Sequence, residues 1–366
     1  MVVSFPRMSI ASILSQQAAW KRLKKNKGAI AGLIIIILAI FTAIFSYFIA
    51  PDSSPYANRI ILEIRKQKPG FKKTFLKVPK ETFVKSGFFD HLLFGTDDKY
   101  EFIPINSYHS MNKDSIVALK FIDEGVEEEN TFAINKLPAS FTTTKKFWLG
   151  TDKFGRDILS RIIIGTRVSL SVGLITVIIS LSIGVLLGSL AGYFRGRTDN
   201  IIMWLTNIIW SIPTLLLVFA ITFALGKGFW QVFIAVGLTM WVNVARLVRG
   251  QVLSIRELEY IEATRVLGFS HFRTIFHHIL PNIMGPVLVI AASNFASAIV
   301  IEAGLSFLGV GVQPPQPSWG LMIKENYSFI ITQNPMLALA PGFAIMLLVL
   351  AFNLLGNGLR DALDVR

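Results

Sequence analysis

The sequence predicts an all-α membrane protein with six transmembrane helices. Three observations favour this class: only 16% of the 366 residues are charged, the mean hydropathy is +0.56, and several long stretches carry no charge. Soluble globular proteins carry roughly 25% charged residues, so a cytosolic enzyme and a disordered protein are both disfavoured. The chain has no Cys, which excludes a disulfide scaffold, a Cys-ligated metal site and a Cys nucleophile.

Six stretches are long enough to cross a bilayer, which takes about 20 apolar residues. The 18-residue stretch at 228–245 also fits a buried soluble helix, but the other five make a membrane span the better interpretation. The first stretch is too long for a signal-peptide core, and no Ala-x-Ala-like cleavage site follows it. The predicted spans are residues 28–50, 168–194, 200–226, 228–245, 279–301 and about 336–355.

The distribution of Lys and Arg predicts that both termini are cytoplasmic. The tail 1–27 contains basic residues and no acidic ones, and positive charge marks the cytoplasmic side. Six spans return the C-terminus to the cytoplasm and place the loop 246–281 there as well. Basic residues at 153–167 would lie outside, at the end of a long loop, and long loops translocate largely regardless of charge. The net charge of +13 therefore fits anionic lipid headgroups and does not call for a nucleic-acid partner.

Residues 51–148 form a block of different composition between the first and second spans. Their Lys and Arg nearly balance their Asp and Glu, and short apolar runs alternate with turn residues. The many Phe residues disfavour a disordered loop. We expect a small extracytoplasmic domain that contains strands, followed by a membrane core over residues 149–366 with the other five spans.

The predicted spans lack the residues that membrane catalysis and ion coupling use. Their apolar cores hold almost no ionisable groups, which disfavours a proton-coupled transporter and an intramembrane enzyme. No G-x-x-x-x-G-K-[ST] motif occurs, so the chain has no P-loop of its own. His277 and His278 are adjacent and point to different sides of a helix, so no metal site is predicted. The G-x-x-x-G spacing at 184–192 predicts close helix packing.

The loop 246–281 is predicted to hold two short helices. Ser254 to Glu257 has the pattern of a capping box, which predicts a helix start near Ile255. Gly268 is placed to end that helix, because Gly adopts the left-handed conformation at little cost. Ser270 can cap a second helix through Ile279, and Pro281 would open the next span.

This loop resembles the EAA loop of ABC importer permeases, which has Glu-Ala-Ala, a Gly six residues after the Glu, and a distal Leu-Pro. Thr264 takes the place of the second Ala and is also small. The resemblance implies that Glu262 makes polar contacts with a cytoplasmic ATPase, Ala263 allows close approach, and Gly268 makes the turn. The matching residues are Glu262, Ala263, Thr264, Gly268, Leu280 and Pro281.

Further segments resemble the C-type permease of dipeptide and oligopeptide importers. They include Leu149-Gly150-Thr151-Asp152 with its continuation to Arg167, Glu302-Ala303-Gly304-Leu305, and the end of the chain from Asn353. The resemblance covers about residues 18–55 and 147–366. It implies a type I ABC importer permease of a bacterial inner membrane, with a large extracytoplasmic insertion between helices 1 and 2.

The resemblance also implies the partners and the division of chemistry among them. The chain would pair with a second homologous permease subunit, two cytoplasmic ATPase subunits and an extracytoplasmic substrate-binding protein that delivers a peptide. ATP and magnesium would be bound by the ATPases, so the chain would be no enzyme and would need no cofactor. The alternative hypothesis is a membrane-anchored sensor or assembly protein whose block 51–148 binds an extracytoplasmic partner.

Overall fold

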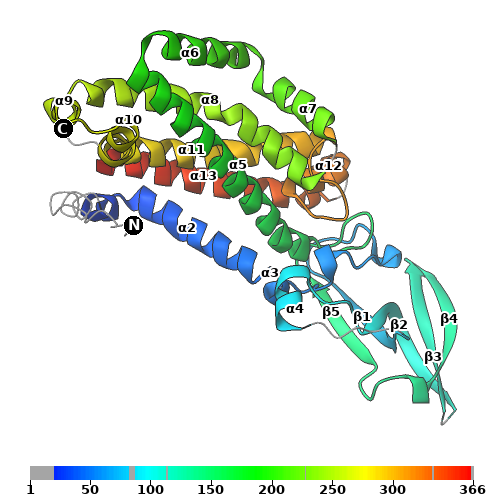
Figure 1. Cartoon of the computed structure of the whole chain (residues 1–366). Helices are drawn as coiled ribbons and strands as arrows, with labels where there is room; N and C mark the ends of the chain where they lie inside the picture. Colours follow the sequence, from blue (N-terminus) through cyan, green and yellow to red (C-terminus); the bar gives the residue numbers. More distant parts are fainter. Residues whose placement is uncertain (1–19, 82–86, 113, 227, 332–333, 364–366) are drawn as a thin grey trace. The chain divides into compact units, whose positions relative to one another are not determined.

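The computed structural model describes residues 20–81, 87–112, 114–226, 228–331 and 334–363. Most of the predicted tail 1–27 therefore lies outside the described residues. Within them, five helices are long and apolar enough to cross a membrane (Figure 1). They are α2 (Lys27–Ile44), α5 (Ile158–Phe194), α8 (Phe229–Arg256), α11 (Leu280–Leu308, which continues the helix begun at His271) and α13 (Met336–Leu363).

The third predicted span, 200–226, is not one straight helix. It is a pair, α6 (Gly196–Ser211) and α7 (Thr214–Leu225), bent by 95° at the break between them. Pro213 lies in this break, and Ile212 before it has extended backbone with φ −91° and ψ 129°. The residue before a proline is disfavoured in the helical region, which explains the break. A sixth span exists only if the bent pair crosses as one unit.

The chain forms two compact units that share several helices. Unit 1 comprises residues 1–39, 171–302 and 346–366, and unit 2 comprises residues 40–170 and 303–345. The described part of unit 1 contains only helices and their connections. Unit 2 adds the sheet and the helix α12 (Trp319–Asn326).

Three glycines of α5 form a seam against α8 in unit 1. A Cβ on Gly188 would lie 2.5 Å from the Ala245 carbonyl oxygen, and one on Gly184 would lie 2.5 Å from the Val244 Cβ. Gly192 meets α8 in the same way, one turn further on. Distances below 3 Å cannot be accommodated without a shift of the helices. The prediction that this glycine spacing serves close helix packing is confirmed.

The first and last helices of unit 1 meet at one end. The Asn26 side chain donates a hydrogen bond of 3.2 Å to the Asp361 carboxylate. Gly358 of α13 packs against Ala29 of α2, and Gly285 near the start of α11 faces Leu363. The start of α2, the start of α11 and the end of α13 therefore lie at the same end of unit 1.

The strands expected in block 51–148 are present as a five-stranded antiparallel sheet in unit 2. Its strand order is β4-β3-β2-β1-β5, and hairpins connect β2 to β3 and β3 to β4. The fold class all-α is therefore wrong for the chain as a whole and holds for the membrane helices. The strands are β1 (Phe71–Pro79), β2 (Tyr100–Asn112), β3 (Ser115–Asp123), β4 (Val126–Ala133) and β5 (Thr142–Phe147).

Both faces of this sheet are covered at its centre. Neighbouring residues of a strand point to opposite faces, and both Phe75 and Leu76 of β1 are fully buried. Phe75 packs with Ile64 and Phe147, whereas Leu76 packs with Ile105 and other apolar residues of β2 and β3. The sheet thus has a core of its own on each face.

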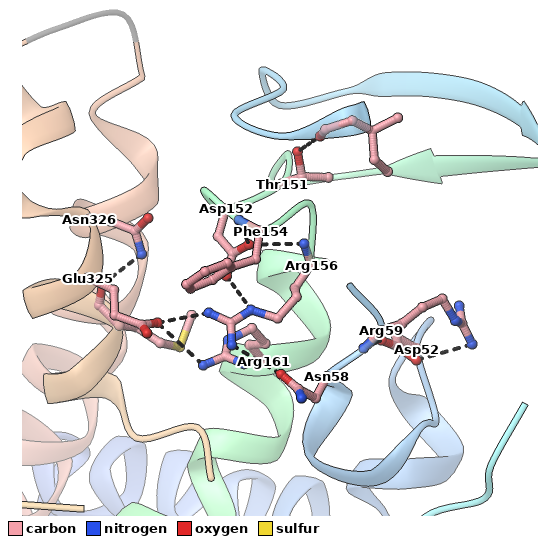
Figure 2. Close-up of polar contacts among 12 residues, drawn as sticks. Asp52, Asn58, Arg59, Thr151, Asp152, Phe154, Arg156, Arg161, Glu325 and Asn326 are labelled. Carbon is pink, nitrogen blue, oxygen red and sulfur yellow. Dashed lines mark hydrogen bonds and ion pairs between the residues drawn. The ribbon is translucent and has the colours of Figure 1, made fainter. Parts of the chain in front are cut away.

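A buried ionic network surrounds the start of α5 in unit 2, as Figure 2 shows. Arg156 donates to the Asp152 carboxylate at 2.6 Å, to the Asn58 side chain at 3.1 Å and to Glu325 of α12 at 2.9 Å. Arg161 is also buried, and its guanidinium lies 3.7 Å from the same Glu325 oxygen. Glu325 therefore joins α12 to the segment that leads into α5.

A second ionic cluster lies where the chain leaves the end of α2. Arg59 pairs with Asp52 at 3.2 Å and also with Asp98, and the Ser160 hydroxyl of α5 accepts a hydrogen bond from the Asp52 backbone. Burial, with the nearby Arg59 charge, lowers the pKa of Lys145 to about 8. The cluster connects the sheet strand β5 and the residues after α2 to the first turn of α5.

The Arg156 network predicts a large difference between two arginine substitutions. Arg156→Met leaves Glu325 and Asp152 buried without their main cation, which costs about 3–5 kcal/mol of unfolding free energy. The matched control is Arg65→Met, whose pair with Asp123 is 3.8 Å apart and more than 60% exposed, so about 1 kcal/mol or less is expected. Urea unfolding of the purified chain in detergent measures both. Equal losses for the two variants would contradict the assigned role of Arg156.

Candidate functional site

The candidate site is the segment between α8 and α11 in unit 1. It contains α9 (Glu259–Val266), a turn at Gly268, the short helix α10 (His271–Arg273) and the π-helical turn η4 (Thr274–Ile279). The two predicted helices with a turn between them are thus present. Ser270 caps the second one as expected, because its side chain accepts a hydrogen bond from the Arg273 backbone at 3.3 Å.

The predicted start of the first helix near Ile255 is wrong. The helix α8 continues to Arg256, so the Ser254 capping pattern lies inside α8 and starts nothing. Val248 and Val252 of α8 are fully buried in a core cluster, and Ile255 packs against it. This packing continues the apolar face of α8 past the capping pattern.

Gly268 makes the turn that the sequence predicts. Its φ is +73°, and a Cβ there would meet no atom within 4 Å, so backbone conformation rather than space selects Gly. The Phe269 N–H donates to the Thr264 carbonyl at 3.0 Å, and the Gly268 N–H donates to the Arg265 carbonyl at 3.0 Å. These two bonds form a Schellman motif that closes the C-terminus of α9.

Apolar side chains hold this segment on the membrane helices. Ile261 of α9 and Ile275 and Ile279 of η4 are buried in one cluster with Val248 and Val252 of α8. Each buried aliphatic side chain contributes about 1.5–3 kcal/mol. The segment is therefore fixed to α8 and does not hang as a free loop.

A polar contact ties the same segment to the end of α5. The Tyr193 hydroxyl lies 2.9 Å from the His271 ring nitrogen Nδ1, and the two rings meet edge to face. On the far side, Asn282 donates to the Tyr260 hydroxyl at 3.2 Å, and burial raises the pKa of Tyr260. Contacts on both sides make the segment a rigid projection of α5, α8 and α11.

The predicted site residues separate into exposed and supporting groups. Glu262, Ala263 and Gly268 are exposed on α9 and its turn. Thr264 points inward, since its hydroxyl donates to the Ile261 carbonyl at 2.7 Å and lies 3.3 Å from the Thr274 hydroxyl. The Thr in place of the second Ala of the EAA pattern therefore faces the chain's own core.

Leu280 and Pro281 lie at the base of the segment rather than at its tip. The helix runs through them without a break, so Pro281 does not start the span but continues it after η4. Proline has no N–H and clashes with the carbonyl four residues earlier, and the wider π turn precedes it here. Leu280 packs against the cluster that holds the segment.

The structure adds three apolar residues that motif reasoning missed. Val266 is 87% exposed, Leu267 70% and Phe272 67%, and all three lie around the turn at Gly268. Phe272 stacks on Phe276 with ring centroids 4.3 Å apart. We call Val266, Leu267 and Phe272 the apolar tip. Large exposed apolar groups gathered beside a turn mark a surface for a partner.

A second feature of unit 1 is a cavity of about 220 Å³ with polar side chains in its wall. Trp210 of α6, Thr239 and Asn243 of α8, and Asn294 and Ser297 of α11 contribute to its lining. Asn243 and Ser297 are exposed, although they lie midway along helices of membrane-spanning length. No sequence motif indicated these positions. The signal that could have found them is an uncharged polar residue inside an otherwise apolar stretch.

Comparison with known proteins identifies the family. The family described as "Binding-protein-dependent transport system inner membrane component" matches residues 184–366. The family described as "N-terminal TM domain of oligopeptide transport permease C" matches residues 16–69. The range 184–366 includes the whole candidate site.

Curated relatives agree with this assignment. The dipeptide transport system permease protein DppC of Bacillus subtilis is 33% identical over 353 residues, covering 96% of this chain and 86% of the relative. The glutathione transport system permease protein GsiD of Pectobacterium atrosepticum is 42% identical over 238 residues, covering 65% and 78%. The oligopeptide permease OppC of Bacillus subtilis is 42% identical over 230 residues, covering 63% and 75%.

The alignment with DppC is the longest of these three. It spans 96% of this chain and, together with the two family models, shows the family. The chain belongs to the family of binding-protein-dependent transport system inner membrane components.

Proposed function

We propose that this permease subunit forms half of the pathway of an importer for di- or oligopeptides, in a type I ABC importer of the bacterial inner membrane. It pairs with a second homologous permease, two cytoplasmic ATPases and an extracytoplasmic substrate-binding protein. ATP and magnesium are bound by the ATPases, so this chain carries out no covalent chemistry. The peptide class is supported by the printed names of the relatives DppC and OppC.

The proposal rests on the exposed apolar tip and on the packing that fixes it to the membrane helices. The apolar tip and Glu262 project from a segment that Ile261, Ile275 and Ile279 fix to the membrane helices. A cleft on the ATPase would cover the apolar tip and meet the Glu262 carboxylate at its rim. Movement of the ATPases would then displace α8 and α11 together with the segment, because buried side chains fix the segment to these helices.

The structure of unit 1 supports the predicted orientation. The described start of α2, the end of α13 and the first turns of α11 lie at one end. We place that end in the cytoplasm because its flanking residues 21–27 are rich in Lys and Arg. Both termini and the coupling segment are then cytoplasmic, and block 51–148 is extracytoplasmic. The sensor alternative is not supported by the comparisons, since the relatives are named as permeases.

We assign the polar cavity of unit 1 to the translocation pathway. Asn243 and Ser297 are exposed at mid-span, where uncharged polar groups facing lipid would lose hydrogen bonds. Amide and hydroxyl groups suit a peptide, because they pair with its backbone N–H and C=O groups without selecting one side chain. This wall therefore passes the substrate and leaves selection to the binding protein.

The coupling assignment predicts a sharp difference between two glycine substitutions. Gly268→Ala forces a side chain into φ +73°, which costs about 1–2 kcal/mol and displaces the tip. The control Gly250→Ala lies in α8 without positive φ, and neither Cβ meets an atom within 4 Å. We expect peptide uptake in cells to fall for Gly268→Ala and to stay near wild type for Gly250→Ala. Wild-type uptake in both variants would contradict the coupling role of the turn.

The apolar tip predicts loss of ATPase association without loss of the fold. Leu267→Asp places a charge where the ATPase cleft must exclude water, and Glu262→Lys reverses the rim charge, so each variant should co-purify with less ATPase. Thr264→Ala is the matched control, because its side chain faces Thr274 and not the partner. Retention of ATPase by Leu267→Asp, or its loss with Thr264→Ala, would contradict this placement of the interface.

The pathway assignment predicts that bulk on one face of α11 blocks transport. Ser297→Phe fills the polar cavity and should reduce uptake at least tenfold while the complex still assembles. Leu288→Phe is the control, because it is nine residues away on the opposite face of the helix and is exposed. Equal uptake in the two variants would remove Ser297 from the pathway.

A further inference from the structure

The short helix α4 (Phe88–Phe94) has an apolar surface that neither the sheet nor the helices of unit 2 cover. Phe88 is 64% exposed, Phe89 73%, Leu93 54% and Phe94 63%. Phe88, Phe89 and Leu93 fall within one 140° arc of the helix, whereas Asp90, His91 and the last residue, Phe94, lie outside that arc. Four large apolar side chains exposed on seven residues need a cover, because scattered single exposures are normal but such a cluster is not.

Arg167 fixes α4 beside the end of the first membrane helix. Its guanidinium donates to the Leu92 and Leu93 carbonyls of α4 at 2.8 Å each. It also donates to the Ala43 and Ile44 carbonyls of α2 at 3.0 and 3.2 Å. These four carbonyls lie in the last turns of the two helices, where carbonyls lack helical partners and carry partial negative charge. Arg167 of α5 thus holds the end of α4 next to the end of α2, which is a candidate membrane span.

The exposed surface of α4 continues into the apolar surface of that span. The helix α3 (Ser46–Ile49) lies between them, and its Phe48 meets the Phe88 ring at 5.6 Å and the His91 ring at 4.5 Å. Figure 1 shows α3 and α4 next to each other. Phe41, Ile44 and Phe48 are each between 45% and 55% exposed. The apolar residues therefore form one band from the last turns of α2 across α3 to α4.

We propose that α4 is an interfacial helix whose Phe88, Phe89 and Leu93 insert into the lipid at the end of α2. A helix of this kind lies in the plane of the membrane with its apolar face among the upper acyl chains and its polar groups toward water. Asp90, which accepts a hydrogen bond from the Gly87 N–H, and His91, which pairs with Thr96, supply the polar side. The occupant is lipid rather than a protein, because the band is continuous with the side of a membrane-spanning helix.

Contact of α4 with lipid would fix the distance between the sheet and the bilayer surface. The sheet follows α2 and α3 in the chain, and Arg167 belongs to the helix that follows it. Lipid contact of α4 would hold this junction at the membrane surface. The contact with lipid depends only on the chain being a membrane protein, while the choice of the outer leaflet rests on the proposed orientation.

The absence of Cys from the chain allows a direct depth measurement. Phe89→Cys carries a nitroxide label in the full-length chain, reconstituted in phosphatidylcholine–phosphatidylglycerol nanodiscs. Collision with oxygen, which concentrates in lipid, is compared with collision with a water-soluble nickel chelate. Asp90→Cys on the polar side of α4 and Glu128→Cys on the exposed strand β4 are the matched controls. We expect the oxygen-to-nickel ratio at position 89 to exceed both controls several-fold.

Two results would overturn the proposal. A ratio at position 89 equal to that at position 128 would mean that α4 faces water. A high ratio that is lost when the second permease subunit is added would mean that a protein covers α4. Labelling of position 128 by an impermeant thiol reagent tests the side of the membrane separately, so a wrong orientation is distinguishable from a wrong lipid contact.

Arg167 provides an independent variant of the same test. Arg167→Lys keeps the charge but loses the planar donors that reach four carbonyls at once. The label at position 89 should then become more accessible to the nickel chelate, while the label at position 128 stays unchanged. An unchanged label at position 89 would show that Arg167 does not set the position of α4.

Discussion

The glycine seam between α5 and α8 is the contact on which the rest of unit 1 depends. Lipid provides no hydrophobic drive for helix association, so membrane helices rely on close packing, and Gly184, Gly188 and Gly192 bring the two backbones together. The same approach places Tyr193 at the end of α5 beside His271, and Val248 and Val252 beneath Ile261. The segment from α9 to η4 is held in place because the helices beneath it are closely packed.

In unit 2, buried ion pairs are the main polar contacts, and they lie near the end of α2 and the start of α5. Arg156, Glu325 and Asp152 satisfy one another below the surface, and Arg59 does the same for Asp52 and Asp98. Removing one partner from such a network costs more than the network contributes as a whole. The ionic contacts therefore specify how the sheet strand β5, the helix α12 and the start of α5 meet within this unit.

Local rules predicted some features of the segment from α9 to η4 and failed where packing competed. Gly268 could be placed because the left-handed turn excludes most other residues. The capping pattern at Ser254 failed because the buried face of α8 runs through it. The bend at Pro213 has a local cause that hydropathy windows ignore, whereas the strand order β4-β3-β2-β1-β5 arises from pairings distant in sequence. The apolar tip could not be predicted, because the residue type Leu, Val or Phe does not by itself say whether the side chain is exposed or buried.

We infer that the segment from α9 to η4 moves as one body with the membrane helices on which it packs. The most direct measurement is the distance between spin labels at Glu259→Cys in α9 and Ile234→Cys in α8, both exposed residues of unit 1. It is taken in the assembled importer with the ATPases empty and with ATP trapped. We expect the same distance in both states to within about 2 Å, the size of ordinary helix shifts. A larger change would show that the segment flexes against the helices and does not transmit the movement of the ATPases to them as a rigid body.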